Sequence, residues 1–178
     1  RLQVDYLDLY FCHRPDLNTP IVETVAAMTD LVRQGKILYW GTSEWTARDI
    51  ALAHAAAARD NLVPPVMEQP QYNLFTRESF EVDYSRLYKE VGLGTTVWSP
   101  LSRGELVGHY LEEKGGKFVV SKHGNAWLKE AGLPPDYEAR VHKVAEFASV
   151  ARELEITPAR LALAWVLKNP NVTTAILR

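Results

Sequence analysis

This 178-residue sequence has one cysteine, no large excess of charge of either sign and no long apolar run. The single cysteine, Cys12, cannot form an intramolecular disulfide; this favours a reducing compartment, and we predict a cytoplasmic protein. Twenty Lys and Arg against 22 Asp and Glu leave a net charge of −2, so no nucleic acid or anionic membrane is predicted as a partner. No apolar run approaches the roughly 18 residues of a membrane-spanning helix, so no membrane insertion is predicted.

What is present is an alternation of strand-like and helix-like segments in a chain that is 47% hydrophobic, enough to bury a core. Apolar, β-branched or aromatic runs predict strands at 4–12, 37–42, 66–69, 94–99 and 172–177. Periodic apolar faces predict helices at about 20–35, 46–59, 79–90, 138–154 and 157–168. Helix starts are expected at Pro20, at the capping box of Thr46 and Asp49, and at Thr157-Pro158. Residues 104–135, rich in Gly, Lys and Pro, predict a loop with short helical pieces.

This alternation predicts a parallel sheet with crossover helices, either an open doubly wound sheet or a (β/α)8 TIM barrel. The open nucleotide-binding sheet should carry G-x-G-x-x-G at its first turn, and that pattern is absent. Four of the five predicted strands end in hydrogen-bonding side chains, which is typical of the barrel mouth. We therefore predict a partial barrel, with about strands 4 to 8 of the eight, as one domain over residues 1–178. Both ends lie within strand-like segments, so we expect a fragment.

His13 ends the first strand on the same face as Phe11 and Leu9, which places it at the predicted barrel mouth. A histidine there can give a ligand a proton or a hydrogen bond, the alternative being a structural histidine bonded to a loop carbonyl. Cys12 points to the opposite face, so a Cys–His nucleophile pair is not predicted. No histidine or cysteine pair has metal-ligand spacing, so no metal site is predicted.

Ser43, Gln69, Trp98 and Ser99 also stand at strand ends. Hydroxyls, a neutral amide and a flat indole suit a planar heteroaromatic ligand that carries a carboxamide, with the ring stacked on Trp98. The alternative is ordinary capping of strand ends. The following turn, 98–104, contains small residues and Arg103, and it predicts a diphosphate cradle; a solvated arginine in a simple turn is the alternative.

Several motifs in the right order resemble the aldo-keto reductase family, in the branch that contains the voltage-gated potassium channel β subunits. They are His13-Arg14-Pro15-Asp16, Tyr39-Trp40-Gly41-Thr42-Ser43, Glu68-Gln69-Pro70-Gln71-Tyr72-Asn73, Trp98-Ser99-Pro100-Leu101 and the segment 157–165. The resemblance covers nearly the whole chain and is weakest over 115–135.

The resemblance implies a TIM barrel that binds NADPH and transfers hydride to an aldehyde or ketone. Of the family's catalytic Asp, Tyr, Lys and His, only the histidine is matched, by His13; the other three would lie in or after earlier strands. The implied cofactor contacts are Ser43 and Gln69 to the carboxamide, Trp98 to the ring, and Ser99, Leu101 and Arg103 along the diphosphate. Three residues depart from the family pattern. The family has Asn or Arg in place of Glu44 and Gly in place of Arg178, and the channel subunits have Lys in place of His109.

We therefore expect an NADP(H)-dependent reductase of carbonyl compounds as the parent protein. The alternative is a cofactor-sensing β subunit that regulates a voltage-gated potassium channel. His13 favours the reductase, because the channel subunits have asparagine there. A small-molecule carbonyl substrate is the expected partner, with a homo-oligomer or a potassium channel as further partners. The 178-residue chain alone is expected to be inactive and prone to aggregation, because unpaired sheet edges would be exposed.

Overall fold

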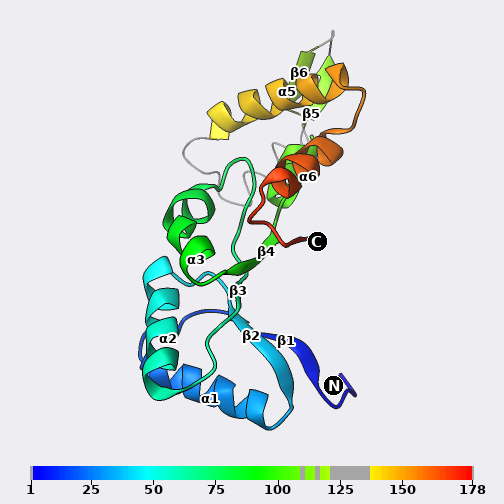
Figure 1. The fold of residues 1–178 in the computed structure, drawn as a ribbon. Helices are drawn as coiled ribbons and strands as arrows, with labels where there is room; N and C mark the ends of the chain where they lie inside the picture. Colours follow the sequence, from blue (N-terminus) through cyan, green and yellow to red (C-terminus); the bar gives the residue numbers. More distant parts are fainter. Residues whose placement is uncertain (1, 109–110, 115–116, 121–136, 178) are drawn as a thin grey trace.

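The computed structural model describes residues 2–108, 111–114, 117–120 and 137–177 (Figure 1). Its main sheet is parallel and contains β1 (Leu7–Cys12), β2 (Ile37–Thr42), β3 (Met67–Glu68), β4 (Gly94–Trp98) and β7 (Thr174–Ile176). The strands lie side by side in the order β1-β2-β3-β4-β7, so each one pairs with the next of the sheet along the chain. A doubly wound sheet reverses its strand order at a switch point. The sequential order is therefore that of a barrel sheet.

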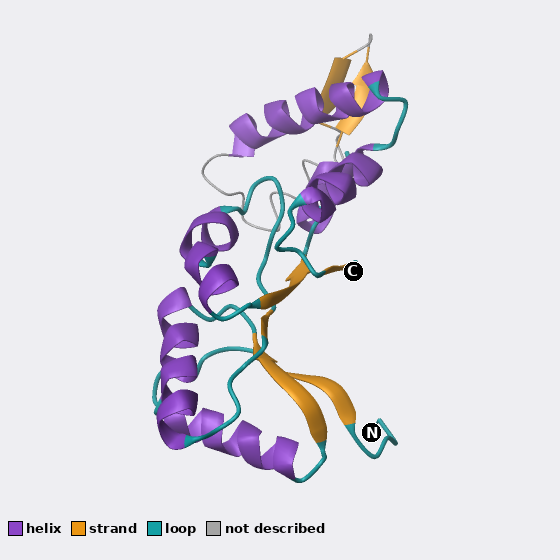
Figure 2. Ribbon diagram, viewed as in Figure 1, coloured by secondary structure: helices purple, strands orange, loops and turns teal. Residues whose placement is uncertain are grey.

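Among the described residues, five α-helices accompany the sheet: α1 (Ile21–Arg33), α2 (Ala47–Asp60), α3 (Ser85–Glu90), α5 (Tyr137–Glu153) and α6 (Pro158–Lys168). Figure 2 shows α1, α2 and α3 together on one side of the strands. Two predicted caps are confirmed, since Thr46 Oγ1 accepts from the Asp49 N–H at 3.1 Å and Thr157 Oγ1 from the Arg160 N–H at 3.2 Å. Pro20 precedes α1 as its cap residue instead of occupying the first helical position.

The core lies between these helices and the face of the sheet that they cover. Val25 of α1, Trp40 of β2 and Ile50 of α2 are completely buried there. Ala53 and Ala57 face the same cluster, and their small side chains let α2 pack closely. The Trp40 indole N–H donates to the Val63 carbonyl at 3.0 Å, so its one polar group is satisfied inside the core.

The other face of the sheet carries large apolar side chains that remain exposed. Leu9 of β1 and Tyr39 of β2 are directly paired in register, and they are 45% and 55% exposed. Their chain neighbours Tyr10 and Trp40 point the other way because strand side chains alternate. This face corresponds to the predicted barrel interior. The predicted site lies at the carboxyl ends of the strands that form it.

Two element predictions were wrong in detail. The helix predicted at 79–90 is a π-helical turn, Ser79–Asp83, followed by α3. Within the predicted loop 104–135, the 3₁₀ segment Ser102–Val107 agrees with the expected short helical pieces. Strands β5 (Leu111–Lys114) and β6 (Lys117–Val120), which form an antiparallel hairpin, were not predicted. Each of these short strands is stabilised by pairing with the other, and the sequence of one segment alone does not predict that pairing. Residues 109–110, 115–116 and 121–135 of that prediction lie outside the described part.

Gly41 in β2 illustrates how tightly the strands pack, and it yields a first prediction. A Cβ at Gly41 would lie 2.6 Å from the Met67 main-chain oxygen, whereas one at Gly94 would have its nearest neighbour, the Val66 oxygen, at 3.4 Å. We expect Gly41→Ala to lower the free energy of unfolding by about 1–3 kcal/mol because the overpacked strands must separate. Gly94→Ala is the matched control and should change it by less. Urea denaturation of the full-length protein measures both, and equal effects would contradict the packing argument.

Candidate functional site

A pocket of about 750 Å³ opens at the carboxyl ends of the sheet strands. All seven site residues predicted from the sequence line this pocket; they are His13, Ser43, Gln69, Trp98, Ser99, Leu101 and Arg103. They come from the ends of β1 to β4 and from the turn after β4, and Ile176 of β7 reaches the same pocket. The structure thus brings together side chains that are separated by up to 90 residues of sequence. Their chemical roles stay predictions.

His13 and Cys12 lie on opposite sides of β1, as the alternation of strand side chains requires. His13 is exposed at the pocket, whereas Cys12 packs against the core cluster beneath the helices. Burial raises the pKa of the Cys12 thiol, which disfavours the reactive thiolate. Arg14, which the sequence did not single out as a site residue, donates from Nη1 to the His13 carbonyl at 2.6 Å and to Ser43 Oγ at 3.2 Å.

The Ser43 hydroxyl is nearly fully buried, with 1% of the residue exposed, and it already makes two hydrogen bonds. It donates to the Gln69 carbonyl at 2.9 Å and accepts from Arg14. A hydroxyl has one donor and two acceptor sites, so one lone pair of Ser43 remains for a ligand N–H. Ser43 can therefore accept from a carboxamide without losing either protein contact.

Glu68 lies beneath this end of the sheet with none of its surface exposed. Its carboxylate accepts hydrogen bonds from Thr42 Oγ1, from the Trp45 N–H at 3.3 Å and from the Glu44 N–H. Burial raises the pKa of Glu68 to about 7, and these hydrogen bonds only partly offset that shift. From the sequence, Glu68 was predicted only as the end of a strand, and no pattern indicates that its carboxylate fixes the turn after β2.

Trp98 is held through both its main chain and its indole ring. Its N–H donates to the Pro70 carbonyl at 3.0 Å, and its carbonyl accepts from the Tyr72 N–H at 3.3 Å. Its indole N–H donates to Glu44 Oε1 at 2.8 Å. Glu44 was noted in the sequence only as a departure from the family pattern. The other two departures, His109 and Arg178, lie outside the described residues.

The turn after β4 adopts an unusual backbone conformation. Ser99, Ser102 and Arg103 all have positive φ values of 54°, 49° and 53°, and Gly104 follows with 93°. Non-glycine residues rarely adopt this left-handed region, each at a cost of about 1–3 kcal/mol, and such residues cluster at functional sites. Other parts of the structure must therefore stabilise the turn.

Asn73 supplies part of that support from the loop after β3. Its Nδ2 donates to the Ser99 carbonyl at 3.0 Å, while its Oδ1 accepts from the N–H groups of Phe75 and Thr76 at 2.9 and 3.0 Å. Ser99 Oγ in turn accepts from the Arg103 N–H at 3.3 Å. A single buried amide thus orders both its own loop and the first residue of the turn.

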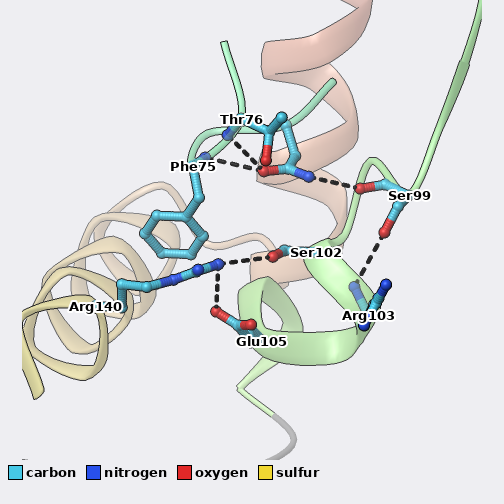
Figure 3. Close-up of polar contacts among 8 residues, drawn as sticks. Phe75, Thr76, Ser99, Ser102, Arg103, Glu105 and Arg140 are labelled. Atoms are coloured by element: carbon cyan, nitrogen blue, oxygen red, sulfur yellow. Dashed lines mark hydrogen bonds and ion pairs between the residues drawn. The ribbon is translucent and has the colours of Figure 1, made fainter. Parts of the chain in front are cut away.

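Arg140 of α5 also supports this turn, through Ser102 and Glu105 (Figure 3). Its guanidinium pairs with Glu105 at 2.9 Å, with both side chains about one-fifth exposed, and it donates to Ser102 Oγ at 3.3 Å. The same group lies over the Phe75 ring, 4.4 Å from its centroid. No sequence pattern indicates this contact, because Arg140 is 38 residues from Ser102.

The pocket fits an extended dinucleotide on the chemistry of its lining. A flat indole, an amide and a hydroxyl with a remaining lone pair stand at one part, and a strained turn with Arg103 stands beside them. Ligand pockets typically measure about 300–1,000 Å³, so the volume also suits such a ligand. Within the part of the chain that the structure describes, no three His, Cys, Asp or Glu side chains gather as metal ligands. Over the same residues, no helix has the length and apolarity needed to cross a bilayer.

Comparison with known proteins identifies the relatives of this chain. The sequence model described as "Aldo/keto reductase family" matches residues 1–178. Proteins named as probable voltage-gated potassium channel β subunits from Arabidopsis thaliana and Oryza sativa are 44% and 42% identical over 181 and 179 residues. A protein from Schizosaccharomyces pombe that is named "Putative voltage-gated potassium channel subunit beta" is 43% identical over 179 residues. These alignments cover 99% of this chain but 51–53% of each relative, so the chain spans about half their length.

The buried carboxylate predicts how stability depends on pH. Because the folded-state pKa of Glu68, about 7, lies above its ordinary value of 4.5, the folded state binds the proton more tightly than the unfolded state. The Glu68 contribution should therefore make the free energy of unfolding fall as pH rises from 4.5 to 7, by up to about 3 kcal/mol. Glu68→Gln should remove this component. Urea denaturation between pH 4.5 and 8 measures it, and parallel profiles for variant and wild type would contradict the assignment.

Proposed function

The chain belongs to the aldo/keto reductase family, a family of (β/α)8 barrels, and from that premise we propose that the full-length protein reduces aldehydes or ketones with NADP(H). The five-stranded parallel sheet is part of such a barrel. Membership supports an oxidoreductase, and the choice of NADP(H) and of carbonyl substrates is the proposal. The observation that carries it is the convergence of seven predicted side chains on one pocket at the strand ends. We further propose that the protein acts in the cytoplasm.

In this proposal, different residues of the pocket bind different parts of the cofactor. Ser43 and Gln69 bind the carboxamide, and Trp98 stacks against the nicotinamide ring. The turn from Ser99 through Leu101 to Arg103 binds the diphosphate, with the guanidinium supplying charge-assisted hydrogen bonds. The bound nicotinamide supplies the hydride that reaches the carbonyl carbon.

His13 acts on the carbonyl oxygen of the substrate. It lies exposed in the pocket, and it donates a hydrogen bond that orients the carbonyl and assists its protonation. The tyrosine that donates the proton in the family has no matching position among these 178 residues. Tyr6, Tyr10 and Tyr39 are not substitutes, because none of them lies at the position that the family motif gives its tyrosine.

A second function, regulation of a voltage-gated potassium channel, is favoured by the names of the relatives at 42–44% identity. The two functions are separable by experiment, since reductase activity needs only cofactor and substrate. Coprecipitation of the full-length protein with a potassium channel would support the second function. A homo-oligomer is a further proposal that size-exclusion chromatography with light scattering tests.

Cofactor binding gives the direct test of the proposed site. Titration of the full-length protein with NADPH and NADH, followed by tryptophan fluorescence, should show binding with a preference for NADPH. Arg103→Met should weaken NADPH binding about tenfold or more, because hydrogen bonds to charged groups contribute about 1.5–3 kcal/mol. Arg86→Met is the matched control, since the Arg86–Glu90 pair is exposed on α3. Absence of dinucleotide binding by the wild type would overturn the proposed function.

His13→Ala tests the catalytic assignment. In the full-length protein we expect a loss in kcat of about 10²-fold or more, because general acid–base assistance contributes typically that much, with an unchanged affinity for NADPH. The pH profile of kcat should also change, because the histidine takes part in protonation. An unchanged rate and profile of aldehyde reduction would remove His13 from the mechanism.

A further inference from the structure

We propose that Glu44 is a positioning residue that fixes the indole plane of Trp98 within the pocket. The proposal deepens the proposed dinucleotide site and rests on it for its functional consequence. Glu44 Oε1 accepts from the Trp98 indole N–H at 2.8 Å, so the carboxylate holds the edge of the ring. Trp98 is one of the residues that line the pocket.

The main chain of Trp98 is already fixed by its neighbours. Its N–H and carbonyl bond to Pro70 and Tyr72 on one side, and Ile176 of β7 is its register partner on the other. What remains free in such a residue is the pair of side-chain torsions that turn the indole plane. One hydrogen bond at the indole N–H is sufficient to select among those rotamers.

Glu44 is itself held rigidly enough to act as that anchor. The same oxygen, Oε1, accepts from the Gln71 N–H at 2.6 Å, which ties it to the segment that pairs with Trp98. Glu44 has a positive φ of 57°, and its own N–H, like that of Trp45, donates to the buried Glu68 carboxylate. Three segments, the turn after β2, residues 70–72 and β4, therefore meet at one carboxylate oxygen.

The residue type supports this role. The family pattern has Asn or Arg at this place. Arginine offers only hydrogen-bond donors, so it could not accept from an indole N–H, and asparagine offers an uncharged acceptor on a side chain one methylene shorter than glutamate. A carboxylate offers only acceptors, and a charged acceptor makes the stronger bond. The consequence is a stacking surface that is oriented before the ligand arrives, which lowers the entropy lost on binding.

The test uses full-length protein with ¹⁵N-labelled tryptophan and three variants. Glu44→Leu removes the acceptor, Glu44→Gln keeps an acceptor without the charge, and Trp98→Phe assigns the Trp98 indole resonance. In the wild type the Trp98 indole N–H should exchange slowly with solvent, and Glu44→Leu should shift the resonance and accelerate its exchange. Glu44→Gln should restore most of the protection. Glu23→Leu, which replaces an exposed glutamate of α1, is the matched control.

Cofactor affinity provides the second readout. Glu44→Leu should weaken NADPH binding about tenfold, the loss expected for one hydrogen bond to a charged group, and Glu44→Gln should weaken it by clearly less. In the Trp98→Phe background, which has no indole N–H, Glu44→Leu should add less than about a twofold effect. Additive effects in that background would mean that Glu44 acts independently of Trp98 and would overturn the proposal.

The two readouts distinguish this proposal from the proposed function. If the wild type binds neither NADPH nor NADH, the proposed function fails, while the indole resonance still decides whether Glu44 holds Trp98. If the resonance and its exchange are unchanged in Glu44→Leu, the positioning role is overturned even when the wild type binds cofactor. Glu44→Ala repeats the test should Glu44→Leu not fold.

Discussion

A buried carboxylate determines the shape of the pocket mouth. Glu68 has no surface exposed, and burying a charged or polar group without partners is costly, so the surrounding donors must converge on it. They come from Thr42, Glu44 and Trp45, that is, from the end of β2 and the turn that follows it. The turn is thereby held in one conformation, with Ser43 directed to the pocket and Glu44 to the Trp98 indole. Two neighbouring parts of the site therefore depend on one side chain that a ligand never touches.

Much of the fold could be predicted from the sequence, because its signals are local. The five strands, the capping box at Thr46 and the helix start at Thr157 follow from short patterns of apolar and capping residues, and the structure confirms them. The prediction was wrong where pairing decides the structure. The hairpin of β5 and β6 is stabilised between two short runs, and the π-helical turn before α3 follows from hydrogen bonds that the residue pattern does not encode.

Part of the candidate site could likewise be predicted from local sequence patterns, and part could not. Residues that end strands, such as His13 and Gln69, could be predicted to share one pocket because parallel strands present their carboxyl ends at one edge. Glu44, Asn73 and Arg140 were not predicted to support the site, because each acts on a partner at least 26 residues away. The family match adds what local physics does not supply, namely the barrel that these strands belong to and the kind of chemistry such a barrel carries.

The support that Arg140 gives to the turn after β4 also bears on the order in which the chain assembles. The contact with Ser102 closes a loop of 38 residues, and closing such a loop carries an entropic cost that adjacent contacts avoid. During synthesis from the amino terminus, the turn leaves the ribosome before α5 exists. Sheet pairing from β1 to β4 needs no later residue, whereas this wall of the pocket waits for a helix made afterwards. The paired strands β1 to β4 can thus form before the turn after β4 gains its support from α5.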